Sequence, residues 1–102
     1  MAKVSMLAKF RTHEGKGDEL IAAFKSVFDQ VDREPGTEVY VLNRAGDDPD
    51  LFWFYELYTD TAALGAHGSS DAMAKGMAEF GPLIAESELV IGAPLQAKGV
   101  AL

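Results

Sequence analysis

The chain has 102 residues, no cysteine, and 16 acidic against 9 basic residues, which gives a formal net charge of -7. This length and balance predict one globular domain over residues 1–102 and argue against a nucleic-acid partner, because no basic cluster is present. The lack of cysteine excludes disulfides, thiolate nucleophiles, iron–sulfur clusters and cysteine-ligated zinc. No apolar run approaches the roughly 20 residues of a membrane span, so we expect a soluble, cytoplasmic protein with no membrane partner.

The first half of the chain predicts a strand, a helix and a second strand. Apolar and polar residues alternate over residues 3–11, which is typical of a half-buried strand. Residues 18–32 carry an apolar stripe at helical spacing, formed by Leu20, Phe24, Val27, Phe28 and Val31. Arg33-Glu34-Pro35-Gly36 ends this helix, since proline cannot continue it. Residues 37–45 alternate again and predict the second strand.

The second half predicts a hairpin, two helices and a last strand. Residues 46–50, Gly-Asp-Asp-Pro-Asp, are a strong turn signal before a third strand over residues 51–58. A short helix over residues 61–67 follows, then a helix that carries Met73, Met77, Phe80 and Ile84, and a last strand over residues 88–94. This order, β-α-β-β-α-β, predicts an α+β, ferredoxin-like fold with a four-stranded antiparallel sheet.

The third strand is the most aromatic part of the chain, and its alternation gives it two faces. Phe54, Glu56 and Tyr58 share one face, which is apolar apart from the carboxylate of Glu56. A carboxylate in that setting needs a partner or a shifted pKa. His67 on the following helix is the partner that the sequence offers, so Glu56 and His67 are a candidate polar pair.

The other face of the third strand predicts a partner subunit. Trp53, Tyr55 and Leu57 lie on it, and Val39 and Val41 lie on the matching side of the second strand. The helices of so short a chain cover one face of the sheet, so a second apolar face needs another cover. We expect a homodimer that packs sheet against sheet through these five residues.

Three sequence features together resemble one known family. They are Glu34-Pro35-Gly36 before the second strand, Tyr55-Glu56-x-Tyr58 on the third strand, and Ala62-Ala63-Leu64-x-Ala66-His67 on the next helix. In this order and spacing they resemble the antibiotic biosynthesis monooxygenase domain, and the similarity extends over about residues 3–95. The resemblance implies a dimeric α/β barrel with a cavity between sheet and helices in each subunit. It also implies, from the characterised members, oxygenation of phenolic or quinol substrates by O2 without flavin, haem or metal.

The chain also departs from the family pattern. Tyr58 stands where Trp is frequent, Ala72 where a second His is frequent, and Phe54 where members that make polyketide quinones carry Asn. Relatives that degrade haem use an Asn and a His at positions near Ala8 and Met77 of this chain. Haem degradation is therefore disfavoured, and a specific polyketide-quinone role is weakened.

The candidate catalytic residues are His67, Glu56 and Tyr58. Imidazole titrates near neutral pH and a buried carboxylate would tune it, which suits His67 as a general base oriented by Glu56. Tyr58 would hydrogen-bond a substrate oxygen. Each also has a structural interpretation, His67 and Glu56 as a satisfied core pair and Tyr58 as a core tyrosine. The candidate substrate-binding residues, as cavity wall, are Phe54, Met73, Met77 and Phe80.

Other chemistries are excluded more firmly. His13 and His67 are the two histidines, 54 positions apart and without metal-ligand spacing, so we expect no metal site. The chain has no Gly-rich phosphate loop and no Gly-x-Ser-x-Gly elbow. The sequence predicts a cofactor-independent monooxygenase that oxidises a small phenolic or quinol-type aromatic with O2. The alternative is a non-catalytic dimeric domain that binds a small ligand or serves in a stress response.

Overall fold

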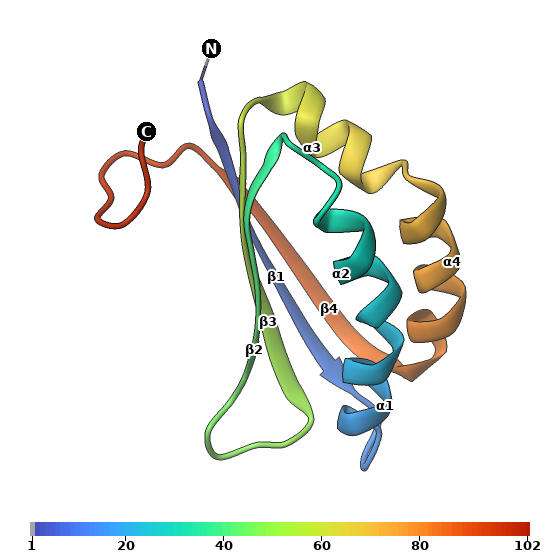
Figure 1. Cartoon of the computed structure of the whole chain (residues 1–102). Helices are drawn as coiled ribbons and strands as arrows, with labels where there is room; N and C mark the ends of the chain where they lie inside the picture. The colour runs from blue at the N-terminus through green and yellow to red at the C-terminus, as the bar shows by residue number, and fades with distance from the viewer. Residues whose placement is uncertain (1) are drawn as a thin grey trace.

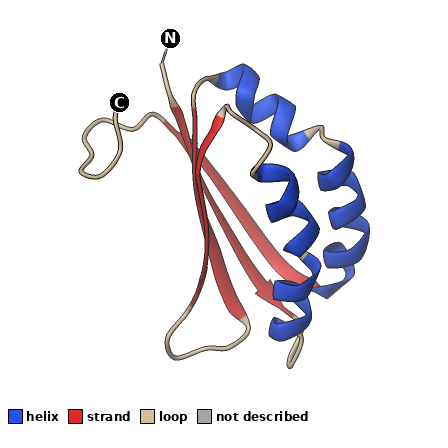
Figure 2. Ribbon diagram, in the orientation of Figure 1, coloured by secondary structure: helices blue, strands red, loops and turns tan. Residues whose placement is uncertain are grey.

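A four-stranded sheet with helices packed on one face makes up the computed structural model, which describes residues 2–102 (Figure 1). The elements in chain order are β1 (Val4–Thr12), α1 (Gly17–Ala23), α2 (Lys25–Val31), β2 (Thr37–Arg44), β3 (Leu51–Tyr58), α3 (Thr61–Gly68), α4 (Asp71–Phe80), the 3-10 helix η1 (Gly81–Leu83) and β4 (Ile84–Gly92). Figure 2 shows the two layers from the side, with the helices all on the same side of the sheet.

The strand order is β2-β3-β1-β4, and every neighbouring pair is antiparallel. This is the arrangement of a split β-α-β domain, so the predicted ferredoxin-like α+β fold is confirmed. β3 lies inside the sheet, between β1 and β2. Its register places Glu56 opposite Met6 on β1 and opposite Tyr40 on β2. Directly opposite residues share a face of the sheet, so these three side chains point toward the helices.

Two element boundaries differ from the predictions. The single helix expected over residues 18–32 is divided into α1 and α2 at Phe24, whose amide N–H is shared between the carbonyls of Leu20 and Ile21 at 3.2 Å each. Such sharing tightens a helix locally toward 3-10 geometry. The last strand begins at Ile84 instead of residue 88, because Pro82 lies in η1 and the chain leaves α4 at Phe80. Ile84 therefore belongs to β4 and not to the preceding helix.

The core lies between the sheet and the helices and is largely aromatic. Phe24 stacks on Phe80 with ring centroids 4.2 Å apart and contacts Phe54 at 4.7 Å. Leu20 and Val27, from α1 and α2, are buried beside these rings. The apolar stripe that predicted the helix thus faces the sheet, as amphipathic packing requires.

The opposite face of the sheet carries no helix. Leu7, Val41, Tyr55 and Val90 are 39–50% exposed on it. The chain after β4 turns to this side near the N-terminus (Figure 1), and Lys3 Nζ donates to the carbonyl of Ala101 at 2.6 Å. Within residues 2–102, no helix has both the length and the hydropathy that a membrane crossing requires.

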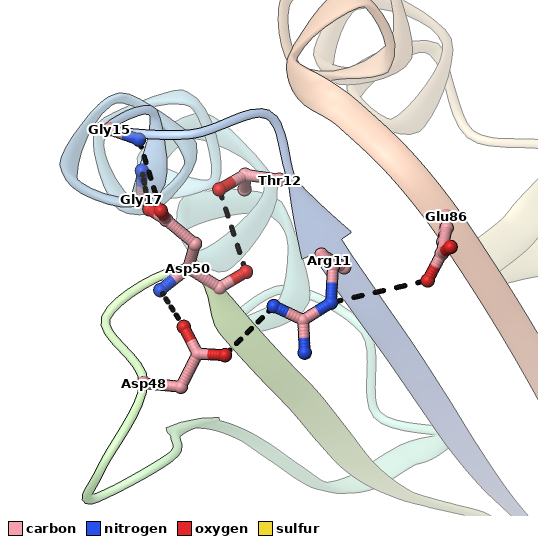
Figure 3. A network of polar contacts seen from close by, with 7 residues as sticks. All are labelled: Arg11, Thr12, Gly15, Gly17, Asp48, Asp50 and Glu86. Atoms are coloured by element: carbon pink, nitrogen blue, oxygen red, sulfur yellow. Dashed lines mark hydrogen bonds and ion pairs between the residues drawn. The ribbon is translucent and has the colours of Figure 1, made fainter.

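A network of polar contacts ties the β2–β3 hairpin to the end of β1 (Figure 3). The Asp50 carboxylate accepts from the amides of Gly15 at 3.0 Å and Gly17 at 3.1 Å. Asp48 accepts from Arg11 Nη1 at 2.8 Å and from the Asp50 amide at 3.0 Å. We call Arg11, Asp48 and Asp50 the hairpin cluster. It fixes the loop that leads into α1.

Candidate functional site

A cavity of ≈ 410 Å³ lies between the sheet and helices α3 and α4. Its wall is apolar over most of its surface, and Glu56, His67 and Tyr40 are the titratable groups that reach it. Met77 and Leu89, 54% and 59% exposed, line the side next to the edge strand β4. This size and composition suit a small, mostly apolar ligand held by a few polar groups.

His67 lies in the last turn of α3 and is 3% exposed. The helix begins at Asp60, whose side chain accepts from the Ala63 amide at 2.8 Å and so caps the first turn. From that start, two turns of helix carry His67 to the cavity wall. Its ring lies 5.0 Å from the ring of Tyr40 and 5.5 Å from that of Tyr58, centroid to centroid.

The partner of His67 is Glu34 and not Glu56. His67 Nδ1 lies 2.8 Å from Glu34 Oε1. The prediction that Glu56 is the polar partner of His67 is therefore wrong, although both residues line the same cavity. Glu34 is 33 residues away in sequence, at the end of the α2–β2 connection, and no periodicity indicated that it would meet α3.

Gly36 makes this meeting possible. A Cβ atom built on Gly36 would lie 2.6 Å from the Cβ of Ala63 on α3, closer than any real contact. With only hydrogen at this position, the backbone after Glu34 can approach α3 directly. The Glu34-Pro35-Gly36 motif therefore has two structural effects. Its glycine allows the close approach of α3, and its glutamate contacts His67.

Glu56 is paired with Tyr58 on its own strand. The Tyr58 hydroxyl donates to Glu56 Oε1, and the two residues are 0% and 2% exposed, respectively. Burial raises the pKa of Glu56 above its ordinary value, while the hydrogen bond from Tyr58 and the nearby His67 oppose that rise. Burial and the same hydrogen bond raise the pKa of the Tyr58 hydroxyl. Tyr58 therefore stays a neutral donor to Glu56.

Tyr40 is a cavity residue that the sequence predictions missed. Burial raises the pKa of its hydroxyl, and the charges of Glu56 and Glu34 raise it further. The phenol is consequently neutral at physiological pH and keeps a proton to donate. Its alternation with Val39 and Val41 on β2 was the signal available, because that pattern places Tyr40 on the same face as Glu56 once the strands are paired.

The other predicted site residues fall into two groups. Met73, Met77 and Phe80 line the cavity, as expected of wall residues. Phe54 is 1% exposed in the core and does not line the cavity, and Tyr58 reaches it only through Glu56. Among residues 2–102, no three His, Asp or Glu side chains gather closely enough to hold a metal ion.

A second hollow, of ≈ 300 Å³, lies on the other side of the Glu34–His67 contact. Both residues line it, together with Gln30 at the end of α2 and Arg33 in the connection that follows. His67 therefore lines both the cavity and this second hollow, which we call the outer hollow, whereas Glu34 lines the outer hollow alone. We call Glu34, Tyr40, Glu56, Tyr58 and His67 the cavity cluster.

The arrangement defines a ferredoxin-like α+β domain with a ligand-sized cavity between its sheet and its later helices. Comparison with known proteins narrows this class. The sequence profile of the antibiotic biosynthesis monooxygenase family matches residues 3–79, and the chain belongs to this family. A comparison with curated protein sequences finds no significant match.

Solved structures with the same fold agree with this assignment. A protein from Chloroflexus aurantiacus, provisionally named as an antibiotic biosynthesis monooxygenase, is 26% identical with a TM-score of 0.84, covering 98% of this chain and 100% of its own. A protein from Caulobacter crescentus with the same provisional name is 25% identical with a TM-score of 0.86, covering 93% of this chain and 92% of its own. A protein from Shewanella oneidensis is 30% identical with a TM-score of 0.84, covering 91% of each chain.

Proposed function

We propose that this chain is a monooxygenase that oxidises a small hydroxylated aromatic compound with O2 and needs no cofactor. The observation that carries this proposal is the placement of His67, held by the carboxylate of Glu34, in the wall of a mostly apolar cavity. The family membership supports the reaction class. The phenolic or quinol nature of the substrate is what the resemblance to characterised members implies, and a mostly apolar cavity with a histidine in its wall suits it.

The cavity favours an uncharged substrate. In the described chain neither lysine nor arginine lines it, and both carboxylates near its polar wall, Glu56 and Glu34, repel an anion. An aromatic compound with a hydroxyl group satisfies these conditions, because its ring fits the apolar wall and its hydroxyl can donate to a histidine. A carboxylate or phosphate ester is disfavoured.

The reaction needs a base and a dry site. For an anthrone-like phenol, the substrate's CH2 group becomes C=O, one oxygen atom of O2 enters the product and the other leaves as water. The substrate supplies the electrons, and it does so far more readily once its hydroxyl proton has been removed. His67 is the proposed general base, since an imidazole titrates near neutral pH. Phe80, which is buried, and Met73, which is half-buried, shield the anion that forms from water on the helix side of the cavity.

The remaining polar residues have supporting roles in this proposal. Tyr40 is the hydroxyl donor that can contact the substrate's oxygen, because it lines the cavity and keeps its proton. Glu56 shapes the polar end of the cavity. Tyr58 holds Glu56 in place and does not touch the substrate. Met73, Met77 and Phe80 form the wall against which the ring packs.

Oxygen consumption tests the proposal directly. The purified protein is added to a panel of quinols and anthrone-like phenols in an oxygen electrode, with a metal chelator present. We expect at least one member to consume O2 in proportion to the protein concentration. No consumption above the uncatalysed rate across the whole panel would count decisively against the proposal.

One observation favours a non-catalytic alternative. Glu56 and Tyr58 are bonded to each other, and His67 is bonded to Glu34, so the polar groups already satisfy one another within the protein. A domain of this kind would bind the same compounds without changing them. Saturable binding of panel members, measured by isothermal titration calorimetry, together with no O2 consumption would establish the alternative.

We also propose that two copies pair through the open face of the sheet. Val41 and Tyr55 are exposed there, Trp53 and Val39 are half-buried, and Leu7 and Val90 extend the apolar area onto the neighbouring strands. Leu57, expected in this interface, is 0% exposed within one chain and adds nothing to it. Sedimentation equilibrium should give about twice the chain mass of 11.0 kDa. Tyr55→Glu, which places a charge at the centre of the face, should give the monomer.

A further inference from the structure

The Glu34–His67 contact uses only one of the two ring nitrogens of His67. His67 has two ring nitrogens, and only Nδ1 faces Glu34. The two nitrogens of an imidazole point in nearly opposite directions. Because Nδ1 is turned to Glu34 and His67 also lines the cavity, we infer that Nε2, on the far edge of the ring, is the nitrogen on the cavity side.

Glu34 is itself held in place by several donors. Its Oε1 accepts from Thr37 Oγ1 at 2.9 Å as well as facing His67 Nδ1, and its Oε2 accepts from Gln30 Nε2 at 3.4 Å. The Glu34 side chain is 13% exposed and lines the outer hollow. An ionised carboxylate only accepts hydrogen bonds, so His67 Nδ1 must carry the proton of their contact.

The position of that proton decides what His67 can do. Neutral imidazole in water favours the proton on Nε2, and a histidine in that form would present a donor to the cavity. A hydrogen bond at one nitrogen selects the tautomer of the ring. Here the bond to Glu34 selects Nδ1–H and leaves the Nε2 lone pair free. The other polar groups around the ring are Tyr40 on β2 and Glu56 and Tyr58 on β3, and none of them is hydrogen-bonded to His67 in the described structure.

We propose that Glu34 is a positioning residue that sets His67 in its Nδ1–H form, so that Nε2 is the atom that takes the substrate's proton. This inference rests on the proposed function for its catalytic part. Nε2 accepts the hydroxyl proton, and the resulting imidazolium is stabilised by the adjacent carboxylate of Glu34. The same nitrogen returns that proton when one oxygen atom of O2 leaves as water, so the ring regains its starting form without exchanging tautomers.

Nitrogen-15 NMR of the histidine rings tests the tautomer without any substrate. In the wild-type protein at a pH where His67 is neutral, we expect its ring spectrum to show a protonated Nδ1 and an unprotonated Nε2. In Glu34→Ala the Nε2–H form should become the major one. Glu34→Asp should restore the wild-type form in part, because it keeps a carboxylate. Glu79→Gln, an exposed change of the same charge on α4, should leave the spectrum unchanged.

The kcat and KM of the Glu34 variants are measured with any panel compound that the wild-type protein oxidises. We expect Glu34→Ala to lower kcat by about 10- to 100-fold, the usual effect of losing a residue that orients a catalytic histidine, while KM changes little. Glu34→Gln keeps an acceptor for Nδ1–H and removes the charge, so it should fold, retain the tautomer and still lose kcat.

The NMR spectra test the tautomer of His67 independently of the proposed function, and the kcat values test the positioning role of Glu34. A wild-type His67 with its proton on Nε2, or a Glu34→Ala variant that keeps the Nδ1–H form, would overturn the tautomer assignment. Unchanged kcat in Glu34→Ala and Glu34→Gln would overturn the positioning role. If the wild-type protein oxidises no compound of the panel, the proposed function fails, while the NMR result still decides whether Glu34 sets the tautomer.

Discussion

The hairpin cluster and the cavity cluster both contain hydrogen-bonded carboxylates, yet the pKa values of these carboxylates shift in opposite directions. In the hairpin cluster, the Arg11 guanidinium lowers the pKa of Asp48, and backbone amides lower the pKa of Asp50. In the cavity cluster, burial raises the pKa of Glu56. The two acids of the hairpin cluster are held in the charged form at the surface, whereas Glu56 is pushed toward the neutral form inside.

The difference shows that the balance between burial and hydrogen bonding decides the direction of the pKa shift. The Asp50 carboxylate lies beside solvent and accepts hydrogen bonds from two backbone amides, and both amides stabilise its charge. Glu56 accepts one hydrogen bond from a hydroxyl and is 2% exposed. The loss of hydration therefore destabilises its charged form more than this hydrogen bond stabilises it. The hairpin cluster therefore contributes to folding, whereas the cavity cluster keeps groups whose protonation can change during a reaction.

Replacing His67 should have the largest effect of any single change. We expect His67→Ala to lower kcat for an oxidised panel compound by about 10²- to 10⁴-fold, the range for loss of a general base. His13→Ala removes the exposed histidine and should leave kcat unchanged. Circular dichroism of both variants confirms that they fold. Equal rates in the two variants would show that His67 only supports the structure.

Tyr58→Phe should reduce stability more than activity. The change removes the hydroxyl that donates to Glu56 and leaves a buried carboxyl without its partner, which costs about 1–3 kcal/mol of the free energy of unfolding. Urea unfolding, followed by Trp53 fluorescence at one protein concentration, measures this cost. Since Tyr58 does not line the cavity, kcat should fall much less than in His67→Ala. A loss of kcat without a loss of stability would instead make Tyr58 a substrate contact.

Glu56→Gln should change how stability depends on pH. Because burial raises the pKa of Glu56, the folded state binds its proton more tightly than the unfolded state does. The wild-type protein therefore loses stability as pH rises from the ordinary glutamate value of 4.5 through the folded pKa. Glutamine does not titrate, so the variant should gain stability relative to the wild type over that interval. A constant difference across this pH range would show that Glu56 is not shifted.

Asp50→Asn should give the opposite pH dependence and the smallest effect. The pKa of Asp50 is lowered by its amide partners, so its contribution to stability is present above the ordinary aspartate value of 3.8. That contribution is lost as pH falls through the folded pKa. The variant should be slightly less stable than the wild type at neutral pH, and the difference should shrink in acid. Urea unfolding at several pH values measures both clusters in one series.

The fold was predictable because its signals are local. The alternation of β1 and β2, the stripe on α1 and α2, and the hairpin turn each depend on neighbours in sequence, and together they led to the correct fold class. The division at Phe24 and the early start of β4 were missed, since both depend on how α1, α4 and the sheet share the core.

Part of the cavity lining could be predicted from the sequence, and the contacts between its polar groups could not. Glu56 stood out as an acid on an apolar strand face, and His67 as a histidine on the following helix. Their partners depend on long-range geometry, because Glu34 reaches His67 only through the close approach at Gly36. Tyr58, two residues from Glu56, was a same-face neighbour in sequence, yet a distant histidine seemed the better partner for a carboxylate.

The source of the oxygen atom in the product tests the central claim most directly. The wild-type protein is incubated under ¹⁸O-labelled O2 with an anthrone-like phenol of the panel, in unlabelled water, and the product is analysed by mass spectrometry. A monooxygenase of the proposed kind incorporates one labelled oxygen atom per product molecule, and His67→Ala shows only the uncatalysed background. Product oxygen taken from water, or a labelled yield equal in the wild type and His67→Ala, would contradict the account.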